Sequence, residues 1–558
     1  MEKESGLSVL IGGKAGFGID KSGVIIARIL SELGYRIYIY RDYPSIIRGG
    51  HTFSIIRASR DKVATHQDRV DFLLALDQDT FNLHKDKLKK ECFFIYDPEE
   101  VKIEGVSACG TAIETGRILK EEGAPEIMRN TCIIGAFCRS AGIGFKILED
   151  ILRRELPKEI DLNLKVAHRG FEEAKELLKV EVTGLQKLPL LSGNQAVALG
   201  LIRGGLNTYI AYPMTPASPI LHFLADIAGD FNLKVIHPES EVGVMLMATG
   251  FSYMGEKVAV GTSGGGFCLM AEGLSFAGMA ELPVVIVLGQ RPGPSTGLPT
   301  YSSQTELHFA LNAGQGDFLR FVVAPGDPQE AYYWSSVALN ISWKYQIPSI
   351  ILTDKNLGEG IFNFDISSVE TIKDESLPLW NKSAPYKRYL NTENGVSPLA
   401  FAPEKGAVIK ANSYEHDESG ITTEDPVITR AMQDKRLRKE EYLSKDMKGY
   451  ETVKVYGDES SRTALLCWGS NKGVCVEAAQ RLGLKVIQPL VFSPFPSDKF
   501  AKALTGVKRL ISVEDNATGQ LAKLIRNYGF KAEDKILKYD GRPFTPDGLE
   551  EELRRLMR

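Results

Sequence analysis

The sequence predicts an α/β protein with several doubly wound domains. Three stretches of the chain alternate short apolar strands with amphipathic helices, a pattern that implies crossover connections and largely parallel sheets. Glycine-rich or polar loops follow several of these strands, at the position where open α/β sheets bind ligands. At 558 residues, the chain is long enough for three or four domains, each with its own core.

The first stretch, residues 1–182, is expected to form one α/β domain. Apolar residues recur with helical spacing between residues 25 and 30, and a charged helical segment over 145–179 closes the domain. Strands are predicted at residues 7–13, 36–40, 52–58, 70–77 and 92–97.

The second stretch, residues 190–365, is expected to form another α/β domain. It opens with a helix over 192–206, for which Ser192 or Asn194 is the N-terminal cap. Strands are predicted at residues 207–213, 233–237, 257–263, 283–290, 319–324 and 349–354.

Residues 366–455 interrupt this alternation and are interpreted as a linker with one solvated helix. Ten of the twenty residues over 431–450 are charged, which is typical of a helix face in water. A third α/β domain is expected over 456–558, with strands at 462–470, 484–490 and 509–515.

Composition excludes several classes of function. Apolar residues make up 43% and charged residues 25%, the balance of a globular chain, and the net charge of −4 with no basic run disfavours nucleic acid as a partner. No stretch is apolar enough to span a membrane, and the acidic N-terminus does not resemble a secretory signal, so we expect a cytoplasmic protein. Seven scattered cysteines without a CxxC pair argue against a disulfide framework, a zinc site or an iron–sulfur cluster carried by this chain alone.

Two loops of the first domain could bind an anion. The segment GGKAGFG (12–18) lies between a strand and a helix, where glycines allow either a tight turn or close approach of a phosphate to the backbone. The segment RGGH (48–51) places Arg48 beside flexible backbone, which suits a carboxylate or phosphate. An ordinary turn with a surface arginine would have the same sequence.

Two segments of the second domain carry stronger signals. In AYPMTPASP (211–219), two prolines fix the backbone on either side of Thr215 at the end of a strand. In PESEVGV, Glu239 and Glu241 lie in the first turn of an apolar helix, where the helix dipole favours acids. If one of the two enters a buried interface, its carboxylate suits proton exchange with a heterocyclic nitrogen.

Two further loops should open at the same sheet edge. GTSGGGF (261–267) makes room for a ligand against the backbone, and GQRPGPSTGLPT (289–300) supplies cationic and hydroxyl groups, including Arg291 and Thr300, that suit a carboxylate. The convergence of three polar loops at one edge is better evidence for a site than any one of them.

Together, YPMTPASP, ESEVGV, TSGGG and QRPGPSTGLPT resemble the α subunit of 2-oxoacid:ferredoxin oxidoreductases, and most closely the 2-oxoglutarate type with a γ-like domain fused ahead of it. GGKAGFG and RGGH resemble that γ domain, and SVEDNATGQL (512–521) resembles the last α/β domain of the family. The resemblance implies a pyrimidine-side thiamine diphosphate domain over 190–365 and a transketolase-C-like domain at the C-terminus.

The resemblance also implies a divided active site. A separate β subunit would bind the diphosphate with Mg²⁺ and carry a [4Fe–4S] cluster, with coenzyme A as co-substrate, ferredoxin as acceptor and an (αβ)₂ assembly. This sequence is consistent with that division, because it has neither a GDG motif with a downstream Asn nor a cysteine set for a cluster.

Residue roles follow from the same resemblance. Glu241 matches the family glutamate that hydrogen-bonds N1′ of the cofactor's aminopyrimidine, and it is therefore the expected catalytic residue. Gly265 stands where the family usually has proline. The remaining expected cofactor contacts are Tyr212, Pro213, Gly264 and Gly265, and the expected substrate contacts are Thr215, Arg291, Thr300 and, for a second carboxylate, Arg48.

The expected function is coenzyme A-dependent oxidative decarboxylation of a 2-oxoacid, with 2-oxoglutarate favoured, coupled to reduction of ferredoxin; in reverse the same site would fix CO₂. Three alternatives remain open. One is the same chemistry on pyruvate or branched-chain 2-oxoacids, and another is a non-catalytic assembly subunit, which would not need Glu241, Thr215 and Arg291. The third, a nucleotide-dependent dehydrogenase or ligase, is disfavoured by the irregular glycine spacing of GGKAGFG.

Overall fold

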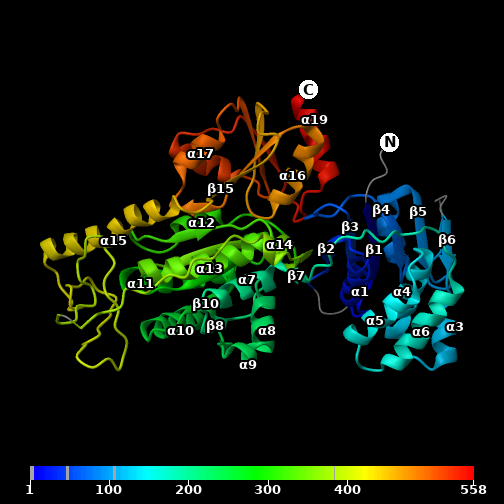
Figure 1. The fold of residues 1–558 in the computed structure, drawn as a ribbon, viewed down its shortest axis with the longest axis horizontal. Coiled ribbons are helices and arrows are strands. Elements are labelled where there is room, and N and C mark those ends of the chain that lie inside the picture. Colours follow the sequence, from blue (N-terminus) through cyan, green and yellow to red (C-terminus); the bar gives the residue numbers. More distant parts are fainter. Residues whose placement is uncertain (1–5, 46–49, 105–108, 383) are drawn as a thin grey trace. The chain divides into compact units, whose positions relative to one another are not determined.

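The computed structural model describes residues 6–45, 50–104, 109–382 and 384–558. The chain divides into two compact units, which are described separately (Figure 1). The first unit comprises residues 1–191, 360–365 and 544–558, and the second comprises residues 192–359 and 366–543. The domain boundaries drawn from the sequence remain a prediction.

An eight-stranded sheet forms the centre of the first unit, in the order β6-β5-β4-β1-β3-β2-β14-β7. The five strands predicted for this domain are all present, whereas three short ones were not predicted. The strands are β1 (Gly6–Lys14), β2 (Arg36–Asp42), β3 (His51–Ser59), β4 (Val70–Ala75), β5 (Leu88–Tyr96), β6 (Cys109–Ala112), β7 (Leu190–Ser192) and β14 (Ile361–Asn363).

The prediction of a largely parallel sheet is wrong for the middle of this unit. β6, β5, β4 and β1 are parallel, but β3 runs antiparallel to both β1 and β2, and β14 runs antiparallel to β2. Only the residues 43–50 connect β2 to β3, and a parallel crossover needs about a dozen residues or more. The length of that connection therefore dictates the antiparallel pairing.

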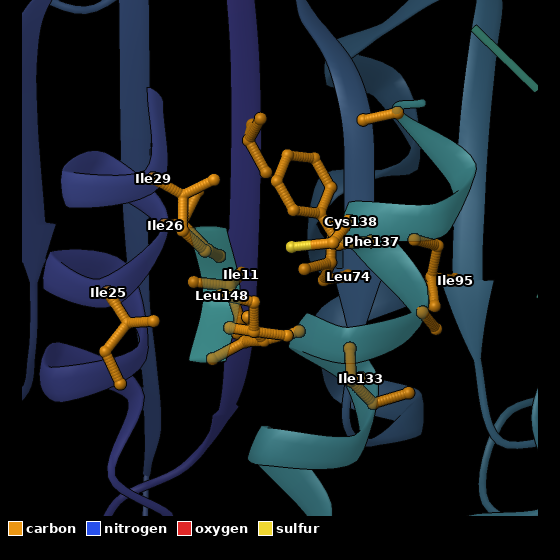
Figure 2. Packing of buried hydrophobic residues seen from close by; sticks show 14 of the residues in the cluster. Ile11, Ile25, Ile26, Ile29, Leu74, Ile95, Ile133, Phe137, Cys138 and Leu148 are labelled. Carbon is orange, nitrogen blue, oxygen red and sulfur yellow. The ribbon is translucent and has the colours of Figure 1, made fainter. Parts of the chain in front are cut away.

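Helices pack on this sheet through a continuous apolar core (Figure 2). Ile26 of α1, Leu74 of β4 and Phe137 of α4 all belong to that core. The helices that contribute to this core are α1 (Ile19–Glu32), α3 (Thr115–Glu122), α4 (Arg129–Ser140), α5 (Phe145–Glu155) and α6 (Ile160–Glu173); the unit also contains α2 (Gln78–His84) and α19 (Pro546–Met557).

The glycines of GGKAGFG all have a structural reason. Gly16 and Gly18 have φ angles of 97° and 69°, which other residues rarely adopt. A Cβ atom on Gly12 would lie 2.8 Å from Thr80 Cγ2, and one on Gly13 would lie 3.1 Å from Ile19 Cδ1. The tight turn and the close packing thus account for this motif without a ligand.

A seven-stranded sheet organises the second unit, in the order β18-β12-β13-β11-β10-β8-β9. All its strands are parallel except β18, which runs antiparallel to β12. The strands are β8 (Thr208–Ala211), β9 (Lys234–Ile236), β10 (Val258–Ser263), β11 (Val285–Gln290), β12 (Phe321–Val323), β13 (Ser349–Asp354) and β18 (Val491–Ser493). The six strands predicted from the sequence are therefore confirmed.

Helices cover both faces of this sheet, as the doubly wound prediction requires. One core lies under α7 (Gly193–Arg203), α8 (Ser218–Asp226) and α13 (Pro328–Tyr345). The other lies under α10 (Glu241–Tyr253), α11 (Gly264–Met279) and α12 (Leu307–Asn312). Neighbouring residues of a strand alternate between the cores: Tyr209 belongs to the first and Ile210 to the second. Two short helices, α9 (Ala228–Phe231) and α14 (Lys355–Glu359), complete this part of the unit.

A five-stranded sheet forms the rest of the second unit, in the order β15-β17-β16-β19-β20. Only β15 is antiparallel to its neighbour. The strands are β15 (Val453–Gly457), β16 (Thr463–Leu466), β17 (Lys485–Pro489), β19 (Arg509–Glu514) and β20 (Asp534–Leu537), and the helices are α16 (Asn471–Leu482), α17 (Ser497–Ala503) and α18 (Gln520–Leu524).

The charged helix α15 (Pro426–Met447) is not solvated all round, so that expectation is wrong for one of its faces. Lys435 and Lys439 are 0% and 1% exposed, and both form ion pairs with the buried carboxylate of Glu281. The count of charges could not reveal this burial, because the partner lies more than 150 residues away in the sequence. Within the described part of the chain, no helix is both long and apolar enough to cross a bilayer.

Candidate active site

The predicted loops do meet at one edge of the seven-stranded sheet. β8, β10 and β11 are parallel neighbours, so their carboxyl ends point the same way. The YPMTP turn follows β8, α11 follows β10 directly, and the loop that contains Arg291 follows β11. This edge is where an open α/β sheet binds its ligands.

Two hydrogen bonds hold the YPMTP turn in place. Nδ2 of Asn194 donates to the carbonyl oxygen of Pro216 at 2.8 Å, and Nη1 of Arg291 donates to the carbonyl oxygen of Thr215 at 2.9 Å. Asn194 is therefore not the cap of α7. That cap is Ser192, which forms a reciprocal capping box with Gln195.

Glu241 occupies the first position of α10 and is only 5% exposed. Ser240 caps the helix by accepting a hydrogen bond from the backbone N–H of Gly243. Among the residues that the structure describes, none forms a hydrogen bond or an ion pair with the Glu241 carboxylate. A buried carboxylate without a protein partner indicates a site that a ligand completes.

The three glycines at the start of α11 accommodate two carboxyl groups. A Cβ atom on Gly266 would lie 2.1 Å from Thr262 Oγ1 and 2.8 Å from Glu241 Oε1, and one on Gly264 would lie 2.7 Å from Glu306 Oε1. At Gly265 the nearest atom would be Ser295 Oγ at 3.8 Å, which leaves ordinary space. Glu241 and Glu306 therefore flank the first turn of α11. The space around Gly265 is compatible with either glycine or the proline that is usual at this position in the resembled family.

This geometry predicts different outcomes for two glycine substitutions. Gly266→Ala should displace Thr262 Oγ1 and the Glu241 carboxylate, and it should lower activity by about tenfold or more if Glu241 has the expected catalytic role, because a misplaced reacting group reduces rates steeply. Gly229→Ala in the short helix α9, where an added Cβ would meet no atom within 4 Å, is the control and should retain most of the activity. Steady-state turnover of both variants provides the test, and equal activities would contradict this packing.

Several polar atoms at the end of β10 and in the segment after Arg291 are buried without a partner among the described residues. The hydroxyl groups of Ser263, Thr300 and Ser302 form no hydrogen bond within the described residues. Burial lowers the pKa of Arg291, whereas the charge of Glu306 acts in the opposite direction. Such unpaired donors are suited to bind a polar ligand at this edge.

The predicted residues are not all brought together. Tyr212 is 37% exposed and its ring lies 6.0 Å from that of His237, and Pro213 lies beside it in the turn. Thr300 is buried, but its hydroxyl contacts neither Arg291 nor Thr215 through a hydrogen bond in the described structure. Arg48 lies outside the described residues.

Sequence reasoning missed two residues of this edge. Asn194 was read as a possible helix cap, although it holds the YPMTP turn. Glu306 precedes a short helix, and an acid at a helix start is ordinarily explained by the helix dipole. The sequence has no signal that would have singled out either residue.

Comparisons with known proteins identify the family. Residues 199–434 match the model "Pyruvate flavodoxin/ferredoxin oxidoreductase, thiamine diP-bdg", and residues 8–173 match "Pyruvate ferredoxin/flavodoxin oxidoreductase". The 2-oxoacid:ferredoxin oxidoreductase subunit alpha of Saccharolobus solfataricus is 32% identical over 98% of this chain and 97% of its own length. The chain belongs to the 2-oxoacid:ferredoxin oxidoreductase α subunit family.

Two further similarities have a bearing on the substrate of this α subunit. The 2-oxoglutarate synthase subunit KorA of Methanocaldococcus jannaschii is 30% identical over 65% of this chain and 98% of its own length. A second similarity is to a solved structure, the 2-oxoglutarate:ferredoxin oxidoreductase from Magnetococcus marinus with 2-oxoglutarate, coenzyme A and succinyl-CoA bound. The match covers 100% of this chain and 100% of the solved chain, with a TM-score of 0.91 and 28% sequence identity. Membership as an α subunit implies partner subunits in an oxidoreductase complex.

The residues at this sheet edge fit thiamine diphosphate. The buried carboxylate of Glu241, which has no partner in the described part of the chain, suits a heterocyclic nitrogen, and the first turn of α11 leaves open space at Gly265. A metal is a different matter: within the described residues, no group of three or more His, Cys, Asp or Glu side chains could hold one.

Proposed function

We propose that this chain is the catalytic α subunit of an enzyme that oxidatively decarboxylates 2-oxoglutarate, with coenzyme A as acyl acceptor and ferredoxin as electron acceptor. The names of its relatives support this substrate: one is a 2-oxoglutarate synthase subunit, and one solved structure contains 2-oxoglutarate and succinyl-CoA. Run in reverse with reduced ferredoxin, the same site would fix CO₂.

One observation carries the proposal: Glu241 is a buried carboxylate, at the edge where the three loops meet, to which no described residue donates a hydrogen bond. Its role is to hydrogen-bond N1′ of the aminopyrimidine and to exchange a proton with that atom. Bound thiamine diphosphate supplies the nucleophilic carbon and the electron sink for decarboxylation. The low exposure of Glu241 suits this role, because it limits the competition of water for the carboxylate.

Arg291 and Thr215 would hold the substrate carboxylate. Nη1 of Arg291 already donates to the carbonyl oxygen of Thr215, so the guanidinium is fixed while its other N–H groups remain to bind an anion. The unpaired hydroxyl of Thr300 would supply a further donor. A second carboxylate, as in 2-oxoglutarate, would require another cation, and Arg48 remains the proposed one.

An exposed apolar surface on α10 and α11 supports a partner subunit. Val242, Leu246 and Met247 of α10 and Leu269 of α11 are 44–53% exposed, and the two helices pack against each other. A contiguous apolar surface of this kind usually marks a protein interface. The proposed partner is a β subunit that binds the diphosphate with Mg²⁺ and carries a [4Fe–4S] cluster, in an (αβ)₂ complex.

The proposal is tested by anaerobic co-expression of this chain with the product of the adjacent gene. The complex would be given coenzyme A, a viologen acceptor and, in turn, 2-oxoglutarate, pyruvate and a branched-chain 2-oxoacid. Viologen reduction that requires both chains and is fastest with 2-oxoglutarate is the expected result. A preference for another acid would replace 2-oxoglutarate as the proposed substrate. If a complex that holds cofactor and cluster reduced no viologen with any acid, the result would favour an assembly role for this chain.

Arg291→Ala should raise the KM for the 2-oxoacid by about 10- to 100-fold, because hydrogen bonds to a charged group contribute about 1.5–3 kcal/mol. The KM for coenzyme A should change little. Arg430→Ala, on the exposed face of α15, is the control and should leave both constants unchanged. Equal increases in the two KM values would contradict a specific role of Arg291 in binding the 2-oxoacid.

A further inference from the structure

Glu306 is a second buried carboxyl group at this sheet edge, and the proposed chemistry does not use it. It immediately precedes α12 and is 9% exposed. Its backbone N–H donates to Oε1 of Gln290, the last residue of β11, at 3.0 Å. This bond fixes Glu306 beside the strand end from which Arg291 extends.

The two oxygen atoms of the Glu306 carboxyl group have different surroundings. Oε1 accepts a hydrogen bond from the Thr305 hydroxyl at 2.8 Å and lies against Gly264 at the start of α11. Oε2 is buried and has no hydrogen-bond partner within the described residues. A carboxylate in this position would have one uncompensated oxygen, whereas a neutral carboxyl group does not carry that charge.

Arg291 is the charged group that acts on this carboxyl group. Burial raises the pKa of Glu306 to about 7, and the Thr305 hydrogen bonds and the charge of Arg291 oppose that increase only in part. The other nearby groups do not add charge at this position: Glu241 lies on the far side of the α11 turn, and burial lowers the pKa of His308 on α12, which keeps it neutral.

We infer that Glu306 is a positioning residue that controls the charge available at Arg291, so that binding of the anionic 2-oxoacid is coupled to protonation of Glu306. When Glu306 is neutral, the guanidinium presents its full charge to the substrate carboxylate. When Glu306 is ionised, its charge offsets that of Arg291 and weakens substrate binding. This inference rests on the proposed function, in which Arg291 holds the substrate.

The coupling has a defined direction. Because Glu306 ionises as the pH rises through about 7, the KM for the 2-oxoacid should rise over the same range and stay constant below it. The charge of Glu306 acts on Arg291, and an electrostatic change equivalent to one pKa unit alters affinity by about tenfold, which sets the expected rise. The coenzyme A KM should not follow this profile.

The test is the pH profile of the KM values of the assembled complex between pH 6 and 8.5. Glu306→Gln keeps the shape of the side chain and cannot ionise, so its 2-oxoacid KM should stay at the low-pH value throughout. Glu440→Gln, on the exposed surface of α15, is the matched control and should retain the wild-type profile. A profile that persists unchanged in Glu306→Gln would overturn the inference.

A second variant tests the coupling without altering Glu306. Thr305→Val removes the hydrogen bond that lowers the Glu306 pKa, so the midpoint of the KM rise should move to higher pH. An unmoved midpoint would also count against the inference. Failure of the proposed function would look different, because the wild-type complex would then oxidise no 2-oxoacid at any pH.

Discussion

Replacing Glu241 with glutamine is expected to reduce turnover of the assembled complex by about 10²- to 10⁴-fold, the range typical of a lost proton-transfer group. Glutamine fits the same space beside Gly266 but cannot exchange a proton with the cofactor nitrogen. The chain should fold and assemble as before, because no described residue depends on this carboxylate for a hydrogen bond. Viologen reduction measures the loss.

The neighbouring acid provides the control for this experiment. Glu239 is exposed and lies just before α10, so Glu239→Gln should retain nearly normal turnover. Calorimetric titration with thiamine diphosphate would show whether the Glu241→Gln complex still binds the cofactor. Near-normal turnover in that variant would remove Glu241 from its catalytic role.

The second large effect is on stability. Glu281→Gln is expected to lower the free energy of unfolding by about 3–5 kcal/mol, because it leaves buried ammonium groups without their counter-charge. Nζ of Lys435 lies 2.6 Å from Glu281 Oε1, Lys439 pairs with the other oxygen, and all three side chains are at most 1% exposed. Denaturant unfolding monitored by circular dichroism provides the measurement.

Two observations check this assignment. Glu441→Gln, which removes an exposed ion pair on the same helix, should change stability by only about 0.5 kcal/mol. Burial alone would raise the pKa of Glu281, but Lys435, Lys439 and Arg388 together hold it below its usual value. This contribution is therefore present at neutral pH and is lost as the pH falls below about 4.5. Equal effects of the two substitutions would contradict the buried network.

The sequence was informative where local pattern determines structure. Apolar runs in the sequence predicted six strands of the seven-stranded sheet, β8 to β13, because a strand that is buried on both faces is apolar throughout. The candidate loops were found because they follow those strands directly. Chain order and strand direction were enough to bring Thr215 and Arg291 together, as the hydrogen bond between them now shows.

The remaining features depend on contacts between distant residues. Nothing near Lys435 in the sequence indicates that Glu281 will bury it, and nothing near Glu306 indicates that it will lie against Gly264. The antiparallel placement of β3 was missed for a different reason. The alternation of strands and helices elsewhere in this domain favoured a parallel sheet, whereas the short connection from β2 decided the direction of β3.

The shared cofactor site is tested most directly by hydrogen–deuterium exchange at C2 of thiamine diphosphate bound to the assembled complex. Exchange should be about 10²-fold or more faster in the wild-type complex than in the Glu241→Gln complex or in the partner subunit alone. The same exchange rate with and without this chain would contradict a cofactor site to which Glu241 contributes.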